Sequence, residues 1–454
     1  MVNKFKPISV SLSPNVQKDD VALALNLLFR PWKWRQGSAV KELEDNFKKY
    51  LGVKYAVSFN SGRSSLYAIL KALDLPKGSD VALQAFTCNA VPNPILWAGL
   101  NPVYIDCADD FNIDIEDLKK KINYSLIRAL GPQGLPKADK RIVLVVQHTF
   151  GLPAGMDKIN HTTHSTNSQT GVCQYVIEDC AHALGAESVG EPVGVGHLQS
   201  LQNIKQKVGT FGDAAFFSFS RDKVISSVYG GMAVTNDDEI GAKLGELQKQ
   251  FSQPSFFWIK QQLLHPILLY IMVLPLYKFF DLGKIFLVLS QWTHVLSKAV
   301  SWKEKRGLKP NYFPKALPNA LAAMALNQFH KLETFNAHRK KIAEFYYQEL
   351  AGTQFVLPKK ENNIFLRFAI QHPKAHEIIY DAWHKENILL GDWYTTPIAP
   401  DDTQLKTVKY KLSMCPNAER LAKQTLNLPT HINIFPEDAK KIVNFLLTWH
   451  SSHS

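Results

Sequence analysis

Between residues 55 and 186, short apolar runs alternate with segments of helical periodicity, and this rhythm restricts the fold more than any other feature of the chain. Each segment that follows a run carries apolar residues three or four positions apart, which is the helical spacing. Such alternation predicts a mainly parallel sheet with helices on both faces, where ligands bind at the carboxyl ends of the strands. The expected strands are 55–59, 81–86, 101–107 and 141–148, with a further one from residue 175.

The segment Phe211–Thr235 holds the first candidate for chemistry. A continuous apolar run, Ala214–Phe219, is interrupted by Ser218 and followed by a charged turn that ends in Lys223. A lysine held on a turn between two buried strands is screened from water, so its pKa falls and its neutral amine can form a Schiff base. Taken alone, these residues favour a solvated hairpin lysine.

Two other positions could carry chemistry or ordinary structure. The turn Ser61-Gly62-Arg63-Ser64 follows the first strand directly, and backbone N–H groups at a helix start suit a phosphate, although a simple capped turn is commoner. Asp179 lies at the end of a strand, where a carboxylate either caps a helix or holds a cationic ring nitrogen. The pair His161 and His164 stands in a polar stretch without further ligands, so we expect a solvated loop and no metal site.

The distribution of charge is uneven. The net charge is +12, and residues 258–309 contribute half of it, with seven lysines and Arg306 against Asp281 and Glu304. This excess predicts an anionic partner, of which nucleic acid is only one kind, and no nucleic-acid partner is expected. Five scattered cysteines and a start without a signal-peptide core indicate a cytoplasmic protein with reduced thiols.

Taken in order, the motifs of the chain resemble the DegT/DnrJ/EryC1/StrS aminotransferases, pyridoxal-phosphate enzymes of fold type I that mostly aminate nucleotide-linked keto-sugars. Two motifs are specific: E-D-x-A-H-x-x-G-A, and Ser-Phe with a lysine five residues after the serine. The resemblance runs through almost the whole chain. The other segments that carry it include SGRSSLYAILKAL, QAFTCNAV, FGLPAGMD and YGGMAVT.

The resemblance implies a role for each matching residue. Lys223 occupies the position of the Schiff-base lysine that also shuttles a proton, and Asp179 that of the carboxylate which keeps the pyridine nitrogen protonated. His182 matches a position beside the ring. The residues that correspond to the cofactor-phosphate contacts are Gly62, Arg63, Ser64 and Ser218. The resemblance also implies an amino-acid donor, with glutamate expected, a nucleotide-sugar acceptor from polysaccharide biosynthesis, and a homodimer.

Three departures from the family pattern bear on this site. Val228-Tyr229-Gly230-Gly231 replaces the usual Gly-Glu-Gly-Gly after the lysine. Cys88 stands at the position of the ring-stacking aromatic residue, so either Phe86 covers the ring or a sulfur packs there. Some relatives carry histidine in place of the lysine and dehydrate their sugar, and Lys223 argues against that reaction.

The resemblance predicts an α/β, aspartate-aminotransferase-like (fold type I) large domain and a smaller α+β C-terminal domain, joined by a hydrophobic helical insertion. We expect these parts at residues 1–250, 311–454 and 251–310, respectively. A long helix at 319–350 should open the C-terminal part, with a strand at 364–370 and helices at 374–387 and 436–449.

The insertion contains two uncharged apolar stretches, 261–277 and 285–297, flanked by lysines and tryptophans. Each stretch is shorter than the roughly 20 residues that a spanning helix needs, and Pro266 and Pro275 should break the first. One interpretation is a hairpin, within 258–300, that lies peripherally on the anionic inner face of the membrane. The other is a hydrophobic arm buried between two subunits.

Two alternatives to sugar amination stay open. A fold-type-I scaffold could serve as a non-catalytic or regulatory membrane-associated protein, and Tyr229 and Cys88, both outside the family pattern, fit that reading. A different pyridoxal-phosphate reaction on a lipid-linked acceptor is the third.

Overall fold

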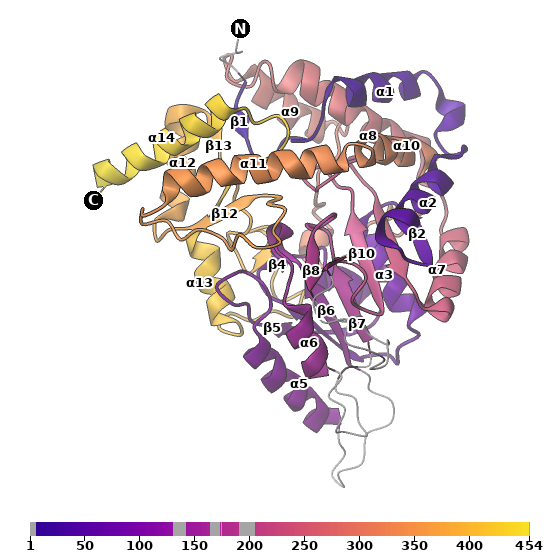
Figure 1. Cartoon of the computed structure of the whole chain (residues 1–454). Helices are drawn as coiled ribbons and strands as arrows, with labels where there is room; N and C mark the ends of the chain where they lie inside the picture. The colour runs from indigo at the N-terminus through magenta and orange to yellow at the C-terminus, as the bar shows by residue number, and fades with distance from the viewer. Residues whose placement is uncertain (1–5, 130–141, 164–172, 174, 190–204, 454) are drawn as a thin grey trace.

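The computed structural model describes residues 6–129, 142–163, 173, 175–189 and 205–453, and its central element is a seven-stranded sheet (Figure 1). The strand order is β2-β11-β10-β7-β6-β3-β5. Its strands are β2 (Tyr55–Phe59), β3 (Asp80–Gln84), β5 (Asn101–Ile105), β6 (Ile142–Gln147), β7 (Tyr175–Asp179), β10 (Ala214–Ser218) and β11 (Gly231–Thr235). The alternation in the sequence thus predicted the strands correctly, with bounds that differ by a few residues.

All strands of the sheet run parallel except β11, which is antiparallel to both of its neighbours. The expectation of a mainly parallel sheet is confirmed. Because Gly231 begins β11 and pairs with both Ser218 and Phe59, the start of this strand lies at the edge where its neighbours end. One edge of the sheet therefore collects the ends of β2, β10, β7, β6 and β3, and it is where the loops with the candidate residues lie.

Helices cover both faces of the sheet because alternate side chains of each strand pack into different cores. Phe217 of β10 lies in the same core as Phe47, whereas Phe216 lies in the other core with Leu66. The helices around the sheet are α2 (Ala39–Leu51), α3 (Gly62–Ala72), α4 (Pro92–Trp97), α5 (Ile115–Ala129), α6 (Met156–Thr163) and α7 (Asp238–Gln250). His161 thus belongs to α6 and not to a loop as expected, and His164 lies outside the described residues.

The C-terminal part packs helices against short strand pairs and has a core of its own (Figure 1). The expected helix at 319–350 is wrong in one respect, because it is divided at His330-Lys331 into two helices. The expected strand at 364–370 is shorter in the structure and pairs with β15. These elements are α10 (Asn319–Phe329), α11 (Leu332–Leu350), β12 (Phe368–Gln371), α12 (Ala375–Glu386), β13 (Ile388–Leu389), β14 (Ile398–Ala399), α13 (Pro416–Gln424), β15 (Thr425–Leu428) and α14 (Pro436–His453).

The N-terminal segment joins distant parts of the chain. Strand β1 (Ile8–Ser9) pairs in parallel with β13, and helix α1 (Lys18–Leu28) packs against α8 (Phe256–Leu268) and α10. The short strands β4 (Thr87–Cys88) and β14 also pair, and so do β8 (Glu187–Val189) and β9 (Lys205–Lys207). The domain bounds at 250 and 310 remain a prediction. The pairing of β1 with β13 joins a strand of the predicted large domain to one of the predicted C-terminal domain.

The two apolar stretches of the insertion differ in their surroundings. Helix α8 (Phe256–Leu268) continues as a π-helical turn, η3 (Leu269–Val273), and is largely buried. Pro266 lies within α8, so the expected break there is wrong, and the helical run ends two residues before Pro275. Helix α9 (Leu282–Trp292) instead buries only Gly283 and Ser290, and its exposed apolar side chains are Leu282, Ile285, Val288, Leu289 and Trp292.

By length and composition, Phe256–Val273 is the single helix among the described residues that would suffice to cross a membrane. More than half of it, 56%, is buried within the protein. Its contacts with α1 and α10 account for this burial. The run therefore behaves as a core helix of this fold.

Candidate active site

A cavity of about 570 Å³ opens at the edge of the sheet where the parallel strands end. Seven of the eight predicted site residues line it, and the exception is Ser64. The seven come from four separate segments of the chain. They are Gly62, Arg63, Cys88, Asp179, His182, Ser218 and Lys223.

Lys223 and Asp179 face the same cavity, and burial shifts the pKa of each toward the neutral form. Burial lowers the pKa of the Lys223 amine to about 8. Burial also raises the pKa of Asp179 to about 6, against a hydrogen bond from the Ala181 N–H and the attraction of Lys223. A nucleophilic amine and a proton-holding carboxylate are thus present together, both poised near neutral pH.

His182 stands as a neutral ring within an aromatic group. Burial lowers its pKa well below 6.5, and Lys223 and Arg367 lower it further. Its Nδ1 accepts a hydrogen bond from the Phe150 N–H at 3.3 Å, and its ring stacks on Trp393 with centroids 5.3 Å apart. Trp393 also lies below the amine of Lys223, whose Nζ is 4.7 Å from the ring centre. The sequence did not single out Trp393, because it lies far along the chain in an irregular loop.

Phe86 and Cys88, the two alternatives for the residue that covers the cofactor ring, lie in different surroundings. Phe86 is fully buried and packs against Phe111, Phe150 and Tyr394, behind the cavity wall. Cys88 lines the cavity, and burial raises the pKa of its thiol, which therefore stays protonated. The sulfur and not the Phe86 ring is the group presented to a ligand.

The start of α3 lies tightly against the ends of β10 and β11. A methyl group on Gly62 would meet the Cβ of Ser218 at 2.9 Å, and one on Gly231 would meet the Gly62 nitrogen at 2.5 Å. Ser61 Oγ accepts from the Ser64 N–H at 3.1 Å, and among the described residues the N–H groups of Gly62 and Arg63 at this helix end have no hydrogen-bond partner. Ser64 itself lies behind the wall, with its hydroxyl donated to Asn60.

Residues of the insertion reach the same cavity, which the sequence did not predict. Gln291 of α9 lines it, together with Lys298 and Ala299. The Tyr229 hydroxyl donates to the Lys298 carbonyl at 2.5 Å, so this residue, outside the family pattern, fastens the end of the insertion to the cavity wall.

A nearby group of possible metal ligands is already used for structure. His148 Nε2 lies 3.0 Å from Glu178 Oε2, near the thiol of Cys180. The Glu178 carboxylate accepts three backbone N–H groups, from Gly209, Phe211 and Gly212, and the His148 Nδ1 accepts one from Ala154. This network fixes the turn that leads into β10.

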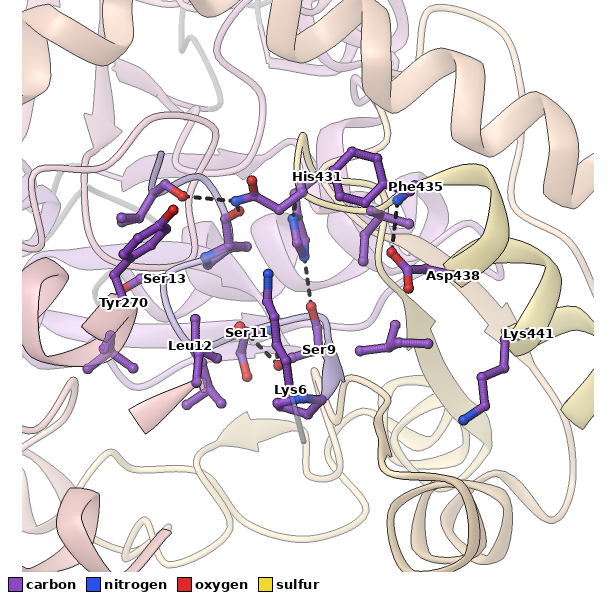
Figure 2. Close-up of a pocket in the computed structure, with 18 of the residues that line it drawn as sticks. Lys6, Ser9, Ser11, Leu12, Ser13, Tyr270, His431, Phe435, Asp438 and Lys441 are labelled. Atoms are coloured by element: carbon purple, nitrogen blue, oxygen red, sulfur yellow. Dashed lines mark hydrogen bonds between the residues drawn. The ribbon is translucent and has the colours of Figure 1, made fainter. Parts of the chain in front are cut away.

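A second cavity of about 600 Å³ lies between the N-terminal segment, η3 and α14 (Figure 2). Among its polar side chains, His431 is bonded to the Ser9 carbonyl at 2.7 Å and Asp438 to the Phe435 N–H at 3.0 Å. Lys223 and Asp179 do not line it, so this cavity lacks the two side chains to which the family resemblance assigns the chemistry.

Solved structures identify the class of fold. The chain superposes on Helicobacter pylori PseC, described as an aminotransferase of pseudoaminic acid biosynthesis, with a TM-score of 0.68 and 20% identity, covering 98% of this chain and 100% of that one. A putative sugar aminotransferase from Streptococcus pneumoniae in its PLP-form gives 0.66 at 19% identity, with 99% of both chains covered. The fold is that of the fold-type-I aminotransferases, as expected.

The sequence pattern of the DegT/DnrJ/EryC1/StrS aminotransferase family matches residues 15–261 and 298–447, and the chain belongs to this family and is an aminotransferase. Curated relatives include GDP-perosamine synthase of Vibrio cholerae, 25% identical with 91% of each chain covered. A UDP-N-acetyl-3-dehydro-alpha-D-glucosamine 3-aminotransferase of Acidithiobacillus ferrooxidans is 26% identical, covering 92% of this chain and 90% of its own. Residues 262–297 lie outside the family match, within the predicted insertion.

Proposed function

We propose that the chain is a pyridoxal-phosphate-dependent aminotransferase that moves an amino group, with glutamate as donor, to the keto group of a nucleotide-activated sugar. The observation that carries this proposal is the presence of Lys223 and Asp179 in one buried cavity. In the balanced reaction, glutamate and the keto-sugar give 2-oxoglutarate and the amino-sugar. The names of the sugar-aminating relatives support the acceptor class.

The residues present fit the cofactor. The lack of a side chain at Gly62 lets the start of α3 lie close to Ser218, and the backbone N–H groups of a helix start suit a phosphate. Asp179 can hold a protonated ring nitrogen, and the Lys223 amine can bind an aldehyde carbon. His182 and the Cys88 sulfur would border the ring. When bound, the cofactor supplies the electron sink that allows a proton to leave the donor carbon.

Each side chain has a definite task in this reaction. Near pH 8 about half of the Lys223 amine is neutral, so its Nζ can take up the proton of the donor carbon and release it on the acceptor side. Asp179 is ionised above pH 6, and its negative charge would keep the ring nitrogen of the bound cofactor protonated. His182 stays neutral, and the hydrogen bond from the Phe150 N–H fixes the orientation of its ring.

Reconstitution tests the proposal. Wild-type protein incubated with pyridoxal phosphate should gain absorbance in the visible–near-ultraviolet range, lose it with glutamate and regain it with a nucleotide keto-sugar. Lys223→Ala should show none of these changes. If the cofactor binds and no amino donor converts it, the non-catalytic alternative replaces this proposal. If only a lipid-linked acceptor restores the absorbance, the acceptor class is wrong.

We also propose that the enzyme is cytoplasmic and that α9 contacts an anionic membrane surface. Ile285, Val288, Leu289 and Trp292 occupy one face of α9 and are 50–77% exposed. In the sequence, Lys278, Lys284, Lys298 and Lys303 lie within and on both sides of this helix. A two-fold contact through α9 would bring the same lysines of two copies together in a chain of net charge +12. Anionic lipids instead complement that charge. The homodimer implied by the family would then use another face.

Vesicle flotation tests the α9 surface. Wild-type protein should float with vesicles that contain phosphatidylglycerol and not with neutral phosphatidylcholine vesicles, and Val288→Glu should abolish this. Leu412→Glu, at an exposed apolar position outside the insertion, is the matched control. If Val288→Glu instead converts a dimer into a monomer in light scattering, α9 is a subunit contact and the membrane proposal fails.

A further inference from the structure

Arg221, two residues before Lys223, is a buried cation in the wall of the active-site cavity that no described carboxylate neutralises by an ion pair. Its side chain is more than nine-tenths buried. The guanidinium donates through Nη2 to Ser297 Oγ at 2.6 Å and lies over the Tyr229 ring. Its Nε finds no hydrogen-bond partner among the residues that the structure describes. A buried arginine remains charged, so an unused donor here is costly unless a ligand takes it.

The neighbouring charges leave an excess of positive charge at this end of the cavity. Arg63 forms a buried ion pair with Glu304 and donates to the Ala299 carbonyl at 3.0 Å. Arg63 and Arg221 are close enough for the first to lower the pKa of the second, after burial itself. Asp222 follows Arg221 in the chain, but its carboxylate also faces Arg367 and Lys223.

The start of α3 lies close to Arg221, because Arg63 belongs to it and its guanidinium acts on that of Arg221. The N–H groups of Gly62 and Arg63 have no hydrogen-bond partner among the residues that the structure describes. Gly62 and Arg63 line the cavity beside Ser218, and α3 is a regular helix of 11 residues whose dipole adds positive potential at its start. A helix N-terminus, a serine hydroxyl and a guanidinium with unused donors together form a site for a doubly charged, tetrahedral anion.

We propose that Arg221, held in position by the insertion, binds the phosphate ester of the ligand that occupies this end of the cavity. This inference rests on the proposed function, under which the phosphate of pyridoxal phosphate is the first candidate. The diphosphate of the nucleotide-sugar has the same chemistry and is the second. Arg221 is thus an anion-binding residue in addition to those that the family resemblance implied.

The insertion has a role in this arrangement. Ser297, the acceptor for Arg221, donates its own proton to Gln262 Oε1 at 2.7 Å, and both residues lie in the segment outside the family match. Ser297 and Gln262 therefore fix the direction of the guanidinium. The insertion builds part of the anion site from within the same chain.

The test compares two ligands that differ only in the phosphate. Dissociation constants for pyridoxal phosphate and pyridoxal are measured by fluorescence or absorbance titration of the full-length apo-protein. In Arg221→Gln the constant for pyridoxal phosphate should rise about 10- to 100-fold while that for pyridoxal stays unchanged. Arg221→Lys should retain part of the affinity, and Ser297→Ala should lose about 2- to 10-fold. Arg30→Gln, at an exposed arginine outside the cavity, should bind as wild type.

The outcomes separate the possibilities. If Arg221→Gln leaves both cofactor constants unchanged and weakens binding of a nucleoside diphosphate to the loaded enzyme, the phosphate site serves the sugar carrier. If neither changes, or if pyridoxal and pyridoxal phosphate are weakened equally, Arg221 is structural and the inference fails. A wild-type protein that binds no pyridoxal phosphate at all would instead refute the proposed function.

Discussion

Arg63, in the first turn of α3, and Glu304, near the end of the predicted insertion, form a buried ion pair across the active-site wall. Burial is the largest single influence on the pKa of Arg63 and lowers it, but the attraction of the Glu304 carboxylate, added to those of Tyr229, Cys88 and Tyr312, makes the net shift upward. The Glu304 backbone carbonyl also accepts from the Asn93 amide at 2.9 Å. The pair thus joins the start of α3 to the segment that encloses the cavity.

Glu304→Gln should destabilise the protein by about 3–5 kcal/mol, because it leaves the Arg63 guanidinium buried without a counter-charge. Chemical denaturation followed by tryptophan fluorescence measures the loss. Replacing both residues, Arg63→Met with Glu304→Leu, should recover most of it. An equal loss in the single and double variants would show that hydrogen bonds, and not charge, account for the stability.

The rate at which pyridoxal phosphate attaches to the apo-protein should rise with pH around a midpoint near 8. The pKa of Lys223 is lowered from 10.5 to about 8, so the neutral amine accumulates above pH 8 and is scarce at pH 6. Stopped-flow absorbance over pH 6–9.5 measures the profile. A rate that continues to increase toward pH 10.5 would mean that the amine is not held in a buried environment.

Asp179→Asn should slow the half-reaction with glutamate about 10²-fold or more, because the amide cannot hold a positive charge on a ring nitrogen. The carboxylate has a pKa of about 6, so the wild-type rate should also fall below pH 6 as Asp179 gains a proton. Single-turnover absorbance measures both effects. In the variant the rate should no longer fall below pH 6. If it still falls there, a group other than Asp179 causes the loss.

Gly62→Ala should weaken pyridoxal-phosphate binding and cost about 1–3 kcal/mol of stability, because its Cβ would meet Ser218 at 2.9 Å and the Phe217 carbonyl at 3.3 Å. Gly245→Ala in α7 is the matched control, since a Cβ there meets nothing within 4 Å. It should stabilise the protein by up to about 1 kcal/mol through helix propensity. Thermal unfolding and cofactor titration of both variants make the comparison.

Local sequence patterns predicted the sheet because its strands depend on neighbouring residues, whereas the roles proposed for Lys223 and Asp179 came from the family resemblance. The bounds of β2 agree with the prediction, and Asp179 lies at a strand end where parallel sheets bind ligands. The break at His330-Lys331 was missed because neither proline nor glycine marks it. The different surroundings of α8 and α9 depend on packing against α1 and α10, which two similar uncharged stretches cannot reveal.

The phosphate-binding candidates illustrate the other limit. Ser64 was expected in the cavity from its place in a motif, yet its hydroxyl turns to Asn60. The sequence did not predict a role for Arg221, because its environment depends on Ser297, which is distant in sequence and lies in a segment outside the family match. Contacts between segments far apart in the chain decide such roles, and single-sequence patterns carry little information about them.

The parallel pairing of β1 with β13 has a consequence for how the enzyme matures on the ribosome. Ile8 pairs with Ile388, so strand β1 emerges from the exit tunnel long before its partner β13 is synthesised. At about 5–20 residues per second this interval is roughly 20–75 s. During that time the nascent N-terminus is open to chaperones and proteases, and the final closure of the molecule must follow nearly complete translation.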